Sequence, residues 1–262
     1  MTTSNKLLAQ SILLLAALCG TVSIAMFALA PTGSLRIFRT EWPLAGVLAW
    51  DALLSLAFFV QHSGMVRRSF RAWLGRFVPL RYHAAIYAIA SGVVLAAVVV
   101  FWQPSEPRLL VLDGLPRRLA EAISIAAIGL FFWGGFTLRS FDPFGLSPIR
   151  DYLKGRREHP PVFVVRGPYR WVRHPLYFCI LLFFWTTPEV TPDRLLFNIL
   201  WTAWIWIGTE LEEIDLTVEF GDAYREYRRT VPMLFPWRIG MTPRQGATVG
   251  SQAQRGTPRA RG

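Results

Sequence analysis

Residues 84–102 read AAIYAIASGVVLAAVVVFW and contain no charged side chain. A helix that crosses a bilayer needs about 20 predominantly apolar residues, because the lipid core offers no water to unpaired backbone groups. Residues 7–30, 44–61 and 119–137 meet the same requirement, and Asp51 and Glu121 are the only acids inside these four stretches. The sequence therefore predicts an all-α integral membrane protein.

The composition of the whole chain agrees with this class. The 262 residues are 53% hydrophobic and 17% charged, whereas a soluble domain is about 25% charged. Intrinsic disorder is excluded, and an ordinary soluble enzyme is disfavoured. Cys19 and Cys179 both lie in apolar runs without the spacing of a metal site. We expect two free, buried thiols and no disulfide scaffold.

A fifth apolar stretch, residues 175–209, is interrupted by a short polar segment: Pro188, Glu189, Pro192, Asp193 and Arg194. This pattern predicts a helical hairpin with arms at 175–187 and 193–209. At 1.5 Å per residue, each arm is shorter than the roughly 30 Å lipid core. The expected fold is polytopic, with five to six transmembrane helices that include this C-terminal hairpin, and with a cytoplasmic helical extension.

The positive charges indicate an orientation. Segments 1–6, 62–83, 138–174 and 210–262 carry 22 of the 28 Lys and Arg residues. These segments face one side if both termini do, and cytoplasmic loops carry the excess of positive charge in membrane proteins. We therefore expect both termini in the cytoplasm.

The basic C-terminal end is set apart by its composition. From Arg238 onward the chain has five arginines and no acid, and such a segment cannot bury a core. We expect one membrane-embedded domain, residues 1–237, with its core motifs at 138–237, and a disordered tail at 238–262. Attraction to anionic lipid accounts for the basic charge. No nucleic-acid motif accompanies it, and no nucleic-acid partner is expected. The sequence assigns no oligomeric state.

The first polar cluster is RGPYRWVRHPLY at residues 166–177, directly before an apolar helix. Pro175 suits the first helical position, because the N–H that proline lacks would be unpaired there. The following backbone N–H groups, together with Arg173 and His174, predict a site for a carboxylate or phosphate at membrane depth. Anchoring of a helix at the lipid headgroups explains the same arginines equally well.

Seven acids lie within residues 210–226, beyond the last apolar run. Acids at a helix C-terminus oppose the helix dipole, so we expect the helix to continue past them. On this helix Glu212, Asp215 and Glu219 share one face, while Glu213 is turned away by about 100°. A hairpin would return this helix to the Arg-His cluster. The acids would then form a structural ion-pair lattice or hold the ammonium group of a zwitterionic ligand.

An amino-acid nucleotide such as S-adenosylmethionine has a carboxylate, an ammonium group and a flat base. The cations, acids and aromatic rings of the two clusters suit these three groups. The sequence has no G-x-G-x-x-G after a strand and no P-loop, so a soluble nucleotide-binding fold is not expected. Membrane helices and their extensions would have to bind such a cofactor.

These motifs resemble a known family. Two of them are similar to motifs of the isoprenylcysteine carboxyl methyltransferase superfamily. The first is RHPLY at residues 173–177, and the second consists of Glu212, Glu213, Leu216, Phe220, Gly221, Tyr224 and Tyr227. Three shorter motifs resemble one subgroup of this superfamily, the bacterial methanethiol S-methyltransferases, and more loosely the NnrU-type proteins. They are QHSGM at 61–65, Phe141-Asp142 with Phe144-Gly145-Leu146, and Thr187-Pro188.

The resemblance implies a membrane methyltransferase that uses S-adenosylmethionine and converts a small thiol, methanethiol, to dimethyl sulfide. The cofactor-binding residues it implies are His174, Tyr177, Glu213, Tyr224, Pro175 and Arg166. Arg173, Glu212 and His174 would act on the substrate: Arg173 would lower the pKa of the thiol, and Glu212 or His174 would accept its proton. Cys179 departs from the family, which often has glycine there, and its side chain is expected to narrow the cofactor groove.

Other interpretations stay open. The methyl acceptor could instead be an isoprenylcysteine carboxylate or a lipid amine. A non-enzymatic NnrU-type protein would use His62 and His83 to bind haem or a metal ion, although interfacial histidines arise easily. Asp51 lies inside an apolar span and is a candidate functional residue by its position. We favour a buried carboxyl that is hydrogen-bonded to Ser55 or to a neighbouring helix.

Overall fold

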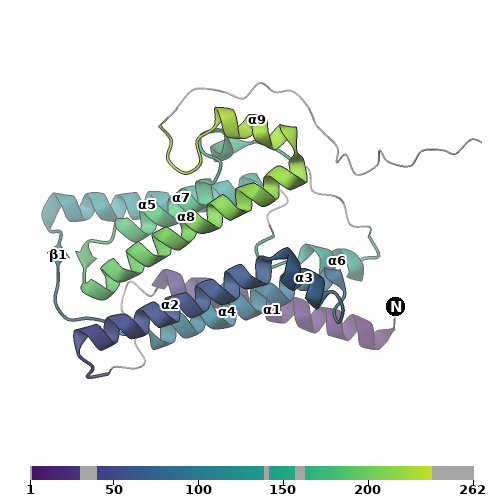
Figure 1. Cartoon of the computed structure of the whole chain (residues 1–262), viewed down its shortest axis with the longest axis horizontal. Helices are drawn as coiled ribbons and strands as arrows, with labels where there is room; N and C mark the ends of the chain where they lie inside the picture. The colour runs from purple at the N-terminus through teal and green to yellow at the C-terminus, as the bar shows by residue number, and fades with distance from the viewer. Residues whose placement is uncertain (1, 30–39, 139–141, 157–162, 238–262) are drawn as a thin grey trace, which may run out of the picture. The chain divides into compact units, whose positions relative to one another are not determined.

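The computed structural model describes residues 2–29, 40–138, 142–156 and 163–237 (Figure 1). The chain divides into two compact units. The first comprises residues 1–122, 142–158 and 184–204, and the second comprises residues 123–141, 159–183 and 205–262. The predicted tail, residues 238–262, lies outside the described residues.

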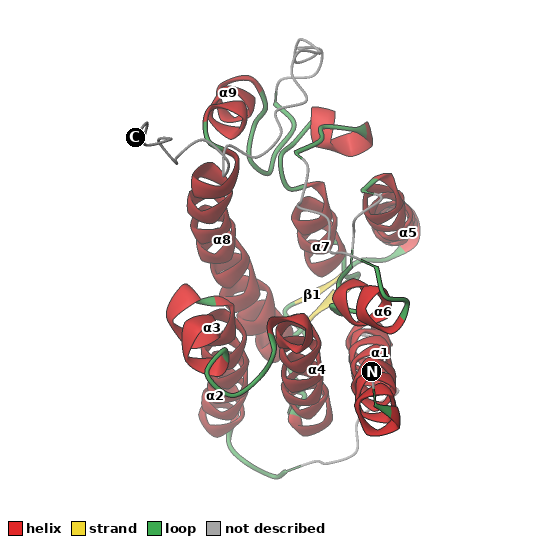
Figure 2. Cartoon of the chain, turned by 90° about the vertical axis from the view of Figure 1, so that its right-hand side faces the viewer, coloured by secondary structure: helices red, strands yellow, loops and turns green. Residues whose placement is uncertain are grey.

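Helices make up nearly all of the described secondary structure, which confirms the predicted all-α class (Figure 2). The helices are α1 Thr3–Leu29, α2 Leu44–Val66, α3 Arg68–Leu74, η2 Leu80–Tyr82, α4 His83–Phe101, α5 Gly114–Thr137, α6 Ser147–Leu153, η3 Gly167–Arg170, α7 Pro175–Trp185, α8 Pro192–Phe220 and α9 Asp222–Thr230. Two short strands, β1 Leu110–Val111 and β2 Glu189–Val190, pair antiparallel.

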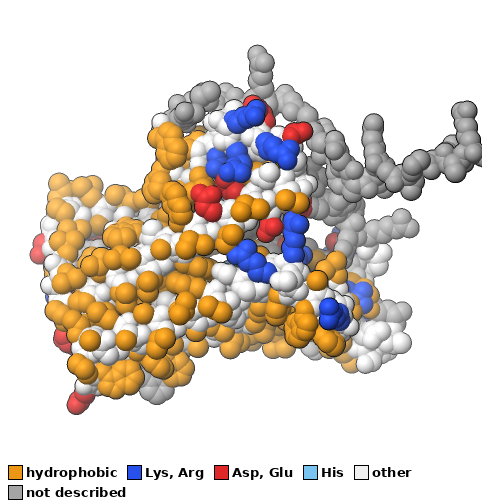
Figure 3. Space-filling view, viewed as in Figure 1, with side chains coloured by type: hydrophobic (Ala, Val, Ile, Leu, Met, Phe, Trp, Pro, Cys, Tyr) orange, Lys and Arg blue, Asp and Glu red, His pale blue; other side chains and the backbone are white. Residues whose placement is uncertain are grey.

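Four segments are long and apolar enough to cross a membrane: α1, α2, Leu80–Phe101 and α5. They coincide with the four stretches expected from the sequence, and the protein is an integral membrane protein. The arms of the expected hairpin are α7, an apolar helix of 11 residues, and α8, which has 29 residues and continues past five of the seven acids to Phe220. The other two, Asp222 and Glu226, lie on α9, which follows Gly221. Figure 3 shows charged side chains gathered over α9 and the end of α8, and hydrophobic side chains over the long helices.

In the first unit, small residues let α1 and α4 pack closely. A Cβ added to Gly92 would lie 2.8 Å from the Cys19 carbonyl oxygen. Ala9, Ala16 and Ala85 are fully buried between the same helices. Small residues at helix interfaces are the usual way for membrane helices to gain van der Waals contact, since lipid supplies no hydrophobic force between them.

Polar contacts attach the first half of α8 to α2 within this unit. The indole N–H of Trp201 donates to the Ser55 hydroxyl at 3.2 Å, and that of Trp204 donates to the Ser63 hydroxyl at 3.0 Å. Of the two kinds of partner expected for Asp51, Ser55 or a neighbouring helix, the structure does not show Ser55. Asp51 Oδ1 accepts the backbone N–H of Gln103, just beyond α4, at 2.9 Å. The carboxyl is fully buried, as expected.

In the second unit, the segment before α7 is held against α5. Gly167 adopts a left-handed φ of +52°, and a Cβ there would lie 2.8 Å from the methyl carbon of Thr137. Only glycine adopts this conformation readily. The buried side chains of Tyr224, Tyr227 and Val231 form a small core on which Phe163 packs. This unit contains every residue of the candidate site.

Candidate functional site

The start of α7 is fixed by backbone pairing with a segment far along the chain. The N–H of Arg173 donates to the carbonyl of Pro232 at 2.9 Å, and that of His174 donates to the carbonyl of Met233 at 3.1 Å. Helix α7 then begins at Pro175, as expected from the proline rule. The two residues before the helix therefore have a defined position relative to the end of α9.

Arg173 and Glu213 form a bidentate ion pair. Arg173 Nε donates to Glu213 Oε1 at 2.5 Å, and one terminal nitrogen donates to Oε2 at 2.9 Å. The other terminal nitrogen donates to the carbonyls of Arg228 and Val231. The side chains are only 8% and 1% exposed. Every nitrogen of the guanidinium group thus has a protein partner, and two-pronged pairs of this kind are among the strongest in proteins.

Glu213 has a second cationic partner that the sequence did not reveal. Arg228 Nε lies 3.0 Å from Glu213 Oε2, and its side chain is 41% exposed. Burial raises the pKa of Glu213, but hydrogen bonds from His174 and Arg173 and the charge of Arg173 outweigh it and lower the pKa to about 2. Glu213 is therefore a carboxylate at neutral pH. Arg228 follows buried Tyr224 by four residues on amphipathic α9, and that spacing could have indicated it.

His174 lies between the two glutamates. Its Nε2 is 3.2 Å from Glu213 Oε1, and its Nδ1 is 3.9 Å from Glu212 Oε2. Its ring stacks on Tyr177 with the centroids 5.5 Å apart and the planes at 6°. When Nε2 donates to Glu213, a neutral imidazole leaves Nδ1 with a lone pair. A proton acceptor is therefore held in place by two neighbours.

Glu212 is the more open carboxylate of the pair. Its Oε2 accepts the Tyr177 hydroxyl at 2.8 Å, and its side chain is 43% exposed. Glu213, which helical geometry turns away from the face of Glu212, is the buried one. The two neighbouring acids therefore have different environments: Glu213 is enclosed by cations, and Glu212 is fixed by one hydroxyl and open to a ligand.

Tyr224 has a buried hydroxyl without a hydrogen-bond partner. The residue is 2% exposed, and burial raises the pKa of its hydroxyl above the usual 10. The hydroxyl therefore keeps its proton at neutral pH. In contrast, the Tyr227 hydroxyl donates to the carbonyl of Tyr169 at 2.6 Å. Buried polar groups are nearly always paired in folded proteins, so Tyr224 is the group of this cluster most suited to a ligand.

The other candidate residues of this region lie around the start of α7. Arg166 is exposed in extended backbone before η3, and within the described part of the chain its side chain has no ion pair. Pro175 is buried. Cys179, where the family often has glycine, is 4% exposed on α7.

The two histidines of the first unit have local partners. His62 contacts the Tyr87 hydroxyl, and His83 Nε2 lies 2.9 Å from the Val78 carbonyl oxygen. Among the residues that the structure describes, no three His, Cys, Asp or Glu side chains come together as a metal site. The geometry offers no support for the haem or metal interpretation.

Similar proteins identify the family. Methanethiol S-methyltransferase from Pseudomonas sp. (strain GM41(2012)) is 39% identical over 198 residues, which cover 75% of each chain. The chain belongs to the methanethiol S-methyltransferase family. The Mycobacterium tuberculosis methanethiol S-methyltransferase is 34% identical over 74% of this chain and 80% of its own. Rat nurim is a distant relative, 24% identical over 64% of this chain.

The likeness to methanethiol S-methyltransferases confirms the resemblance stated from the motifs. The matched 198 residues extend well beyond the stretch 138–237 that holds the core motifs. No family model and no solved structure matches the chain.

Proposed function

We propose that this protein transfers a methyl group from S-adenosylmethionine to methanethiol, which yields dimethyl sulfide. The named relatives support the acceptor and the reaction class. The observation that carries the site assignment is the arrangement around His174: a carboxylate buried among cations on one side, and a half-exposed carboxylate, Glu212, on the other.

S-adenosylmethionine, when bound, supplies a methyl group on a positively charged sulfur. Its amino-acid end and its adenosine need an anion, a cation, a hydrogen-bonding group and a flat surface. Glu212 offers a half-exposed carboxylate to the ammonium group, and Arg166 offers an exposed cation to the carboxylate. The unpartnered hydroxyl of Tyr224 and the stacked rings of His174 and Tyr177 provide the rest. The residues present therefore fit the cofactor.

Arg173 has a positioning role in this proposal. The sequence analysis gave it direct contact with the thiol, but all three of its nitrogens already bind Glu213 and backbone carbonyls. We infer that Arg173 acts through Glu213. The pair fixes the carboxylate that orients His174, and it joins the start of α7 to α8 and to the end of α9. Glu213 likewise serves the site as an orienting residue.

Glu212 and His174 are the candidates for the proton acceptor. A thiol with a pKa of about 8.5 or above is mostly protonated at neutral pH, whereas the thiolate is the nucleophile. Nδ1 of His174 takes the proton from the thiol sulfur if the carboxylate of Glu212 holds the ammonium group of the cofactor; otherwise the oxygen of Glu212 that does not bind Tyr177 takes it. The sulfur then forms its new bond to carbon as the donor's carbon–sulfur bond breaks. The buried surroundings favour this charge-neutralising displacement.

The test is a methyl-transfer assay on membranes that contain the protein. Methanethiol and S-adenosylmethionine with a labelled methyl group are supplied, and labelled dimethyl sulfide is measured in the headspace. General base catalysis contributes about 10²–10⁴-fold, so we expect Glu212→Gln to lower kcat by that factor if Glu212 is the base. Glu210→Gln is the matched control, since Glu210 is exposed on the same helix, and it is expected to leave the rate unchanged.

The outcomes separate the alternatives. A large loss in His174→Gln with a small loss in Glu212→Gln would assign the base to His174. Methylation of a prenylcysteine carboxylate or a lipid amine, with no dimethyl sulfide, would keep the methyl transfer and replace the acceptor. Absence of any labelled product from the unmodified protein would overturn the proposal.

We also propose that both termini and the site lie in the cytoplasm, with the protein in the bacterial inner membrane. The segments that carry 22 of the 28 Lys and Arg residues support this orientation. Reporter fusions after residue 112 and after residue 237 test it. Alkaline phosphatase activity is expected for the first position alone, and the reverse pattern would contradict the proposed orientation.

A further inference from the structure

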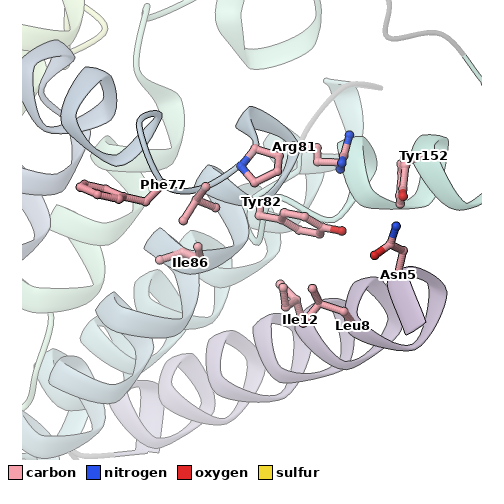
Figure 4. A pocket seen from close by; sticks show the side chains of 10 residues that line it. Asn5, Leu8, Ile12, Phe77, Arg81, Tyr82, Ile86 and Tyr152 are labelled. Carbon is pink, nitrogen blue, oxygen red and sulfur yellow. The ribbon is translucent and has the colours of Figure 1, made fainter. Parts of the chain in front are cut away.

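The first unit contains a cavity of about 340 Å³ that has no part in the proposed methyl transfer. It is formed by the start of α1, the segment after α3, η2, the first turn of α4 and helix α6 (Figure 4). The residues that line it are Asn5, Leu8, Ile12, Phe77, Val78, Pro79, Arg81, Tyr82, Ile86 and Tyr152.

The lining of the cavity is divided by polarity. Figure 4 shows the polar ends of Asn5, Arg81, Tyr82 and Tyr152 gathered at one end, with Phe77 at the other. Most of the remaining lining residues are aliphatic. The cavity therefore matches a ligand with one polar end and one apolar end.

Arg81 supplies an uncompensated positive charge at the polar end. Its Nε is buried and has no hydrogen-bond partner. Its guanidinium carbon lies 4.0 Å from the centroid of the Tyr152 ring and 5.3 Å from that of Tyr82. In the described part of the chain, Arg81 forms no ion pair, not even with Asp151, the residue before Tyr152. A buried, unsatisfied donor on a cation is costly, and an anion would remove that cost.

The lengths of the helices around the cavity are compatible with a position at the level of the lipid headgroups. Helix α1 has 27 residues, or about 40 Å at 1.5 Å per residue, which exceeds the roughly 30 Å hydrocarbon core. The first turns of α1 and of the span Leu80–Phe101 therefore reach the headgroup region. At the rim, Leu8 is 54% and Phe77 is 72% exposed. Phe77 extends the apolar end of the cavity, whereas Leu8 lies beside Asn5 and adds an exposed apolar edge at the polar end (Figure 4).

We propose that this cavity binds the phosphate of an anionic membrane phospholipid. Arg81 donates to the phosphate, the hydroxyls of Tyr82 and Tyr152 add hydrogen bonds, and an acyl chain lies against Ile86 and Phe77. No acid is among the ten lining residues, so the ammonium of a zwitterionic headgroup finds no partner here. The site therefore favours a lipid such as phosphatidylglycerol over phosphatidylcholine.

The test counts phospholipids that stay bound to the intact protein. The protein is placed in nanodiscs of equal parts phosphatidylglycerol and phosphatidylcholine, released, and weighed by native mass spectrometry. We expect one retained phosphatidylglycerol and an affinity at least about tenfold lower in Arg81→Gln, which corresponds to one lost charge-assisted hydrogen bond. Arg76→Gln is the matched control, because Arg76 is exposed in the same segment and does not line the cavity.

A second pair of variants tests the shape of the cavity without removing charge. Leu8→Trp is expected to obstruct the cavity beside Asn5 and exclude the lipid. Leu14→Trp, at an exposed position on the same helix, should keep it. Retention of phosphatidylglycerol by both Arg81→Gln and Leu8→Trp at the level of the unmodified protein would overturn the proposal. So would equal retention of phosphatidylcholine.

A third arm distinguishes a lipid from free phosphate. The protein in detergent is titrated with sodium phosphate alone, and then with short-chain phosphatidylglycerol, and its unfolding temperature is followed. Stabilisation by the lipid but not by the inorganic ion supports the proposal. Equal stabilisation by inorganic phosphate, lost in Arg81→Gln, would reassign the site to a free anion.

Discussion

Arg173 and Glu213 are 40 residues apart in the chain, yet they form a two-pronged ion pair that is almost completely shielded from water. Neither residue is in an apolar run, so the pair is not a by-product of membrane insertion. It joins the segment before α7 to α8, and it orients His174 through the same carboxylate. The site should therefore depend on this pair more than the membrane fold does.

Arg173→Ala and Glu213→Gln are expected to abolish methyl transfer while both proteins remain in the membrane fraction. Removal of one partner from a buried pair costs about 3–5 kcal/mol, because the other charge is left uncompensated. The four apolar spans lie outside this contact and should still insert. Dimethyl sulfide formation and membrane fractionation measure the two effects. Arg225→Ala, at an exposed ion pair on α9, is the control, and full activity in both site variants would contradict the assignment.

The low pKa of Glu213 predicts an acid-dependent loss of stability. Its pKa is about 2 in the folded protein against an ordinary 4.5, so the unfolded chain binds more protons between these values. The contribution of Glu213 is fully present above about pH 5 and is lost as the pH falls toward 2, by about 1.4 kcal/mol per pH unit. Thermal unfolding in detergent at several pH values measures it. The unmodified protein should lose stability more steeply than Glu213→Gln, and equal slopes would argue against a lowered pKa.

Tyr177→Phe is expected to weaken catalysis without weakening the fold. The hydroxyl of Tyr177 donates to the half-exposed carboxylate of Glu212, and a hydrogen bond to a charged group is worth about 1.5–3 kcal/mol. Its loss frees Glu212 to move and should lower kcat/KM by roughly tenfold or more, while the unfolding temperature changes little. A drop in unfolding temperature that accounts for the lost activity would show a structural role instead.

Tyr224→Phe separates a ligand-binding hydroxyl from a structural one. The hydroxyl is buried and has no partner, so its removal should leave the unfolding temperature unchanged or raise it. If the hydroxyl binds the cofactor, the KM for S-adenosylmethionine rises while the protein stays folded. Tyr227→Phe is the comparison, because the Tyr227 hydroxyl donates to a backbone carbonyl and its loss should lower stability. An unchanged KM in Tyr224→Phe would remove Tyr224 from the site.

Gly92→Ala is expected to destabilise the first unit. The added Cβ would lie 2.8 Å from the carbonyl oxygen of Cys19 and 3.2 Å from the Ser23 hydroxyl, so α1 and α4 would have to separate. Overpacking of this kind costs about 1–3 kcal/mol. Gly129→Ala is the matched control, since nothing lies within 4 Å of the added carbon and alanine favours a helix by about 0.5–1 kcal/mol. A higher unfolding temperature in both variants would contradict close packing at Gly92.

Much of the fold could be predicted from the sequence. The lipid core requires long apolar helices, which predicted the four spans and the two helices expected of the C-terminal hairpin. The helix dipole disfavours acids at a helix C-terminus, which predicted that α8 extends past its acids. The rotation of α8 was harder. The sequence placed Glu212 and Glu213 on different faces, but tertiary packing decides which of them is buried, and that is Glu213.

Three further features were not predicted from the sequence. Backbone pairing of residues 173–174 with 232–233 depends on no particular side chain, so the sequence cannot indicate it. Arg228 had one weak signal, its four-residue spacing from Tyr224 on amphipathic α9, which does not identify Glu213 as its partner. The cavity at Arg81 is assembled from several separate segments, so no local pattern could indicate it.

The backbone pairing with Pro232 and Met233 also has a consequence for biogenesis. The ribosome reaches these residues only after all four apolar spans have left it, so the helices can enter the bilayer well before α7 acquires its fixed starting point. The nascent chain therefore cannot complete this arrangement until Met233 has been synthesised, and a chain released before Met233 would be a membrane protein without a functioning centre.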